Sequence, residues 1–125
     1  MVLSLFAGCQ NSQQKEVKQL QSEVMHIHDR TMKKMGYMYE LETSLHKLMA
    51  QKKDNGSGPD REAIQKLQEA QALMMQWMHK YVPPEEGTPY ADQMTYLLDE
   101  KQKIMRIEQL STEAIRLGES LTEVP

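Results

Sequence analysis

Methionine and histidine side chains recur at helical spacing in the first half of this 125-residue chain. Intervals of three, four and three residues separate Met25, His28, Met32 and Met35. Residues three or four apart lie on the same face of a helix, so these four side chains share one face. Thioether sulfur is a soft ligand that suits Cu(I), and imidazole nitrogen binds copper as well. The spacing therefore predicts a candidate soft-metal site.

A second set of the same residue types follows about forty residues later, where Met74 and Met78 share one helical stripe. An antiparallel helix pair would bring this stripe against the first set. The predicted Cu(I) ligands are His28, Met32, Met35, Met74 and Met78, and further candidates are Met25, His46 and His79. The alternative interpretation is packing alone, because methionine is a flexible core residue and this chain contains a single Phe.

Catalytic motifs are absent from the sequence. The chain contains no Gly-rich phosphate loop, no zinc motif of the His-Glu-x-x-His type and no EF-hand loop. His26 and His28, two residues apart on a helix, point in nearly opposite directions and cannot chelate one ion together. We therefore expect a protein that is not an enzyme and has no small-molecule substrate.

Helix breakers divide the chain into three segments with helical periodicity, at about residues 13–53, 60–81 and 89–121. The breakers lie at residues 54–59 and 83–87, which are rich in Gly and Pro. Long helices joined by short loops pack antiparallel, so the sequence predicts an all-α, antiparallel three-helix bundle in up-down-up order with a long first helix. We expect that helix to project past the bundle or to break near Gly36.

Composition narrows the function further. The formal net charge is −3 and the pI is near 5.8, which gives no electrostatic footprint for nucleic acid. The single cysteine, Cys9, cannot form an internal disulfide. The length of 125 residues suits one domain.

The first nine residues, MVLSLFAGC, form an apolar run that ends in Ala7, Gly8 and Cys9. This segment resembles a bacterial lipobox, although Phe6 stands where Leu is usual and no basic residue precedes the run. The resemblance implies export, attachment of lipid to the Cys9 thiol and cleavage before that residue. Residues 1–9 would then be the remnant of a signal peptide, 10–14 a polar tether and 15–122 a single helical domain.

Two Met-rich segments, MHIHDRTMKKMGYM (25–38) and MMQWMHKY (74–81), resemble small helical lipoproteins of Bacteroidota. Some of these proteins are labelled "viral A-type inclusion protein", and the resemblance supplies no activity. It implies a lipid-anchored protein of the cell envelope that faces the periplasm or lies at the cell surface. Within that class we expect either Cu(I) binding by the Met/His cluster or a structural or interaction module that docks an envelope partner.

Overall fold

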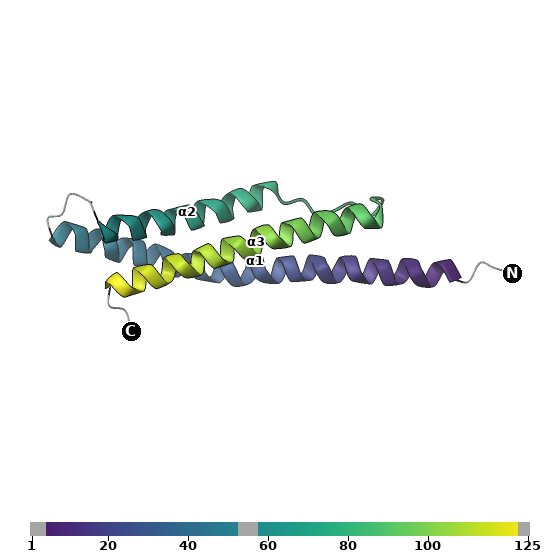
Figure 1. Cartoon of the computed structure of the whole chain (residues 1–125), viewed down its shortest axis with the longest axis horizontal. Coiled ribbons are helices and arrows are strands. Elements are labelled where there is room, and N and C mark those ends of the chain that lie inside the picture. Colours follow the sequence, from purple (N-terminus) through teal and green to yellow (C-terminus); the bar gives the residue numbers. More distant parts are fainter. Residues whose placement is uncertain (1–4, 53–57, 123–125) are drawn as a thin grey trace.

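The chain folds into three helices, which the computed structural model describes over residues 5–52 and 58–122 (Figure 1). Helix α1 spans Leu5–Gln51, α2 spans Pro59–Lys80 and α3 spans Tyr90–Thr122. The described residues contain no strand. The prediction of an all-α three-helix bundle is therefore confirmed. Residues 1–4 of the predicted signal segment and residues 54–57 of the predicted first loop lie outside the described part of the chain.

Helices α1 and α3 run parallel, and α2 runs antiparallel to both (Figure 1). Several side-chain hydrogen bonds between α1 and α3 join residues 78 apart, as in Arg30–Glu108 and Glu23–Lys101, and the Tyr90–Glu16 bond joins residues 74 apart, so the difference is nearly constant. A constant difference in residue number is the signature of parallel helices. The up-down-up order follows.

Helix α1 is longer than expected. It begins at Leu5 rather than near residue 13, and it includes Cys9 and the polar residues 10–14. It also continues through Gly36 without a break, because glycine alone costs a helix only about 1 kcal/mol and the flanking turns are packed. At about 1.5 Å per residue, its 47 residues extend for about 70 Å, against about 33 Å for the 22 residues of α2. Residues 8–16 are all exposed, so the N-terminal end of α1 projects beyond the core.

Three apolar clusters follow one another along the bundle. The cluster near the projecting end contains Val17, Leu20 and Leu97. The central cluster contains Val24, Ile27, Met74, Trp77, Ile104 and Ile107. The third contains Met38, Leu41, Leu45, Ala63, Ile64, Leu67, Ala70 and Ala114. Methionine supplies two of these fully buried side chains, so the core consists chiefly of Leu, Ile, Val and Ala, and the other described methionines are partly buried or exposed.

Candidate functional site

The Met-rich face of α1 lies along the seam between α1 and α2. The residues on that face are Met25, His28, Met32, Met35, Tyr39 and Glu42. Contacts at both ends show that this face is turned to α2: His28 lies beside Trp77, and Glu42 accepts a hydrogen bond from Gln68. Helix α1 packs more extensively against α3, which is the longer partner, than against α2.

An open groove of about 490 Å³ lies in this seam. Its lining residues are Met32, Met35, Tyr39 and Glu42 of α1 and Gln68, Gln71, Ala72 and Met75 of α2. Met75 is 46% exposed and Tyr39 61%, so large apolar groups of the groove are open to solvent. Met32 and Met35 are partly buried because their inner atoms pack on the central cluster. We call this feature the Met groove.

Glu42 is the charged group of the Met groove, and its side chain is 16% exposed. One carboxylate oxygen accepts a hydrogen bond from Gln68 Nε2 at 2.8 Å, and the other accepts one from Gln71 Nε2 at 3.3 Å. His46 Nε2 lies 3.8 Å from the same carboxylate. No Lys or Arg is among the lining residues, so the groove presents a carboxylate held by neutral amides.

A row of rings closes the seam beyond His28. The His28 ring lies 5.8 Å from Trp77, which stacks on Tyr81 at 4.7 Å. Trp77 Nε1 donates a 2.7 Å hydrogen bond to Glu100, a buried carboxylate of α3. Burial raises the pKa of Tyr81, and the nearby Tyr96 and Glu100 raise it further. This row therefore fixes Trp77 firmly between α1 and α3.

The structure divides the five predicted Cu(I) ligands into separate environments. Met32 and Met35 line the groove, whereas Met74 is fully buried among Val, Ile and Trp side chains. Met78 is 39% exposed and is not a lining residue. His28 is not a lining residue either; its Nδ1 lies 3.0 Å from Asp29 Oδ1, and its ring lies beside Trp77.

The three further candidates, Met25, His46 and His79, are exposed. Within the described residues, no group of three or more His, Cys, Asp or Glu side chains could hold a metal ion. Thioethers remain as soft ligands, and the structure brings Met75 to the groove beside Met32 and Met35. Sequence reasoning left Met75 out because it lies one position off the helical stripe of Met74 and Met78. Only the crossing of α1 and α2 decides that this position faces the groove.

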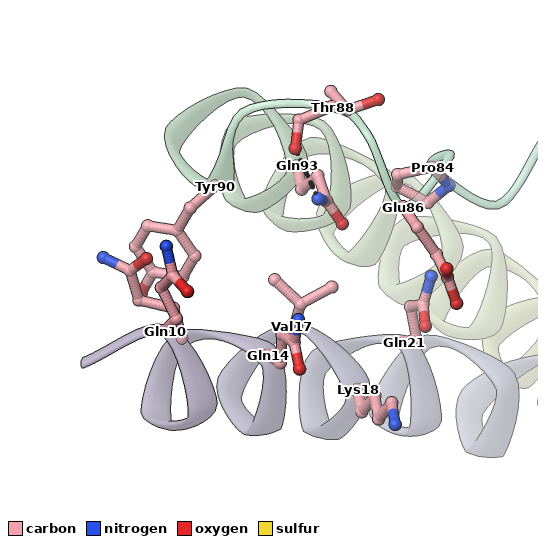
Figure 2. A pocket seen from close by; sticks show the side chains of 11 residues that line it. Gln10, Gln14, Val17, Lys18, Gln21, Pro84, Glu86, Thr88, Tyr90 and Gln93 are labelled. Carbon is pink, nitrogen blue, oxygen red and sulfur yellow. Dashed lines mark hydrogen bonds between the residues drawn. The ribbon is translucent and has the colours of Figure 1, made fainter. Parts of the chain in front are cut away.

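A second concavity, of about 750 Å³, lies at the projecting end of α1 (Figure 2). Glutamines dominate its lining: Gln10, Gln13, Gln14, Gln21 and Gln93. Figure 2 shows Val17 pointing into it, with Tyr90 reaching down toward Gln10 from the opposite side. Tyr90 donates a hydrogen bond to Glu16, and this bond raises the pKa of the phenol. The cleft contains neither His nor Met, so it offers no soft ligand.

Cys9 is exposed on the projecting part of α1. No helix in the described ranges has the length and apolar character needed to cross a membrane. Comparisons with protein-family models, curated proteins and solved structures gave no match.

Proposed function

We propose that this chain is a non-enzymatic, lipid-anchored module of the bacterial cell envelope that binds an amphipathic helix of a partner protein in the Met groove. The observation that carries this proposal is a groove between two helices whose apolar lining is partly exposed. Helix-in-groove recognition uses this geometry, with apolar side chains at i, i+3, i+4 and i+7 as anchors. Methionine adapts to partner side chains of different shape, which suits such a surface.

The charge of the groove defines the partner more closely. Glu42 is held by two neutral amides in an otherwise apolar lining. A Lys or Arg on the partner helix would form a charge-assisted hydrogen bond there. The partner helix therefore carries an apolar stripe flanked by at least one basic residue.

The predicted anchor fits the position of Cys9. Cys9 lies eight helical steps before Val17, which is the first buried residue from position 8 onward, and this corresponds to about 12 Å at 1.5 Å per residue. A lipidated Cys9 would thus hold the bundle close to the membrane on a helical connection. Metabolic labelling of the full chain with an alkyne fatty acid in a bacterial host tests this. Labelling should be lost in Cys9→Ser, and its persistence there would refute the anchor.

A designed amphipathic peptide of Leu and Lys serves as the probe for helix docking. With ¹³C-methyl-labelled methionine, binding should shift the signals of Met32, Met35 and Met75 and leave that of Met105 on α3 unchanged. Met105 is 50% exposed but lies outside the groove, so it reports non-specific contact. A peptide of the same composition without an apolar stripe is the control for charge alone. Absence of groove shifts with the amphipathic peptide would refute the proposal.

Charge reversal provides a matched pair of variants. Glu42→Lys should lower the affinity for the Leu/Lys peptide by about tenfold or more, and tenfold is equivalent to about 1.4 kcal/mol of binding free energy. Glu69→Lys makes the same change in total charge at an exposed position of α2 outside the groove lining, and affinity should stay within about twofold. Equal weakening by both variants would show that net charge, rather than the groove, governs binding.

Binding of a soft metal is the second candidate function, and the observation that favours it is the presence of Met32, Met35 and Met75 in one groove. Three thioethers from two helices form a donor set that prefers Cu(I) to harder ions. Compared with the predicted ligands, this set gains Met75 and omits His28, the buried Met74 and the outlying Met78.

A Cu(I) competition titration against a chromogenic chelator tests this donor set. The triple variant Met32→Leu/Met35→Leu/Met75→Leu removes three sulfurs at nearly constant volume and should lose binding. The matched variant Met25→Leu/Met78→Leu/Met105→Leu removes three exposed sulfurs outside the lining and should retain it. Equal affinity in both variants would refute the groove site.

A further inference from the structure

The methionines of this protein differ sharply in their access to solvent. Met38 and Met74 are 0% exposed in the core. Along the α1–α2 seam, Met75 is 46% exposed, and Met25 and Met78 are 39% exposed. The seam therefore collects reactive thioethers, while those inside the bundle are shielded.

Peroxide converts such a thioether to a sulfoxide. The sulfur attacks one oxygen of hydrogen peroxide, the O–O bond breaks and an S=O bond forms. The sulfur loses two electrons, and the peroxide is reduced to water. The product is polar, which disrupts Met-rich interfaces, and methionine sulfoxide reductases reverse the change.

We propose that Met25, Met75 and Met78 form an oxidation site at which peroxide makes the α1–α2 seam polar and weakens helix docking without unfolding the bundle. This inference rests on the proposed docking function. Its structural basis is the separation of the two kinds of methionine: Met75 lines the groove, whereas the core methionine Met74, its neighbour in sequence, is fully buried. Loss of docking therefore need not involve loss of the core.

The central cluster explains why the fold survives. Met74 packs there with Trp77, whose indole N–H is bonded to the buried Glu100. Peroxide reaches Met74 only when this cluster opens. Met75 has no such protection, because it is on the open side of α2.

The test follows oxidation of the whole chain by hydrogen peroxide, residue by residue, with peptide mass spectrometry. We expect Met25, Met75 and Met78 to react about tenfold faster than Met38 and Met74, with helicity and melting temperature nearly unchanged. Met105, 50% exposed on α3, should react at a similar rate and serves as the reference for a fully accessible thioether. Equal rates for seam and core methionines, or unfolding at the first oxidation, would overturn the proposal.

The consequence for docking is measured with the same Leu/Lys peptide. Oxidation of the wild-type protein should weaken binding about tenfold, and treatment with methionine sulfoxide reductases should restore it. In Met25→Leu/Met75→Leu/Met78→Leu, the ratio of the affinities measured before and after peroxide should fall toward one, whatever the basal affinity of this variant, whereas Met105→Leu should keep the tenfold ratio. Unchanged affinity after full conversion of Met75 would refute the switch. If the reduced protein does not bind the peptide at all, the docking function fails and the switch fails with it, while the order of oxidation is still read separately.

Discussion

The two seams of α1 are built differently although they belong to the same helix. Toward α3, α1 is fastened by charges: Arg30 donates two hydrogen bonds to Glu108, at 2.6 and 2.9 Å, and Lys101 donates one to Glu23 at 2.8 Å. Toward α2, the corresponding positions are methionines and Tyr39, and the hydrogen bonds are made by the amides around Glu42. Ion pairs thus span the surface of the α1–α3 seam, whereas the α1–α2 seam carries an open groove with an apolar lining.

This difference separates stability from binding. Parallel contacts between α1 and α3 hold the long helix in register, and the side chains that α2 contributes to the core, such as Leu67, Met74 and Trp77, lie on its buried face. The open seam can therefore accept a ligand without disturbing the core. The predictions below test that separation.

The largest change in the free energy of unfolding is expected for a substitution in the buried core. Leu41 is 1% exposed and contacts the backbone region of Gly118, so Leu41→Ala should lower the free energy of unfolding by about 2–5 kcal/mol through lost burial and a cavity. Met75→Ala, in the open groove, should cost about 0.5 kcal/mol or less. Urea unfolding followed by circular dichroism measures both variants. Equal losses would show that the groove is part of the core.

Substitutions at two helical glycines should change stability by an intermediate amount and in opposite directions. A Cβ at Gly118 would lie 3.4 Å from Leu41 Cδ1 and 3.6 Å from Leu67 Cδ1, so Gly118→Leu should overpack the site and destabilise by about 1–3 kcal/mol. A Cβ at Gly36 meets nothing within 4 Å, so Gly36→Leu should stabilise α1 by about 0.5–1 kcal/mol through helix propensity. Thermal unfolding should show the two melting temperatures moving in opposite directions, and a fall in both would contradict the structure.

The smallest change in stability is expected for the Arg30–Glu108 ion pair between α1 and α3. Hydrogen bonds from Arg30 lower the pKa of Glu108 below its ordinary value of 4.5. A depressed folded-state pKa adds stability above about pH 4.5, and this contribution is lost as the pH falls through the lowered value. Glu108→Gln should therefore cost about 1 kcal/mol or less at pH 7 and nothing once the carboxyl is protonated.

Urea unfolding at pH 7 and at pH 3 checks the difference between wild type and Glu108→Gln. Glu69→Gln, at an exposed position of α2, is the control and should change stability at neither pH. A gap between wild type and Glu108→Gln that stays constant with pH would show that the pair does not act through its charge.

Much of the fold was predictable because its causes are local. Breakers at residues 54–59 and 83–87 and the helical period between them predicted three helices, and the structure confirms the bundle. The start of α1 was not predicted. The helix begins at Leu5, because the change from apolar to polar residues before residue 13 does not disfavour helix. The candidate site was predicted less well: Met32 and Met35 line the groove, but Met74 lies in the core.

The sequence by itself determined the helical faces and the three-helix order, because amphipathic period and turn chemistry act over neighbouring residues. It also contains the lipobox-like segment, which remains a prediction of an anchor at Cys9. Tertiary structure alone decided which methionines are buried, since this depends on where α2 crosses α1. It likewise decided that Met75 lines the groove and that Met74 is buried. These two residues are adjacent, and their side chains point about 100° apart on one helix.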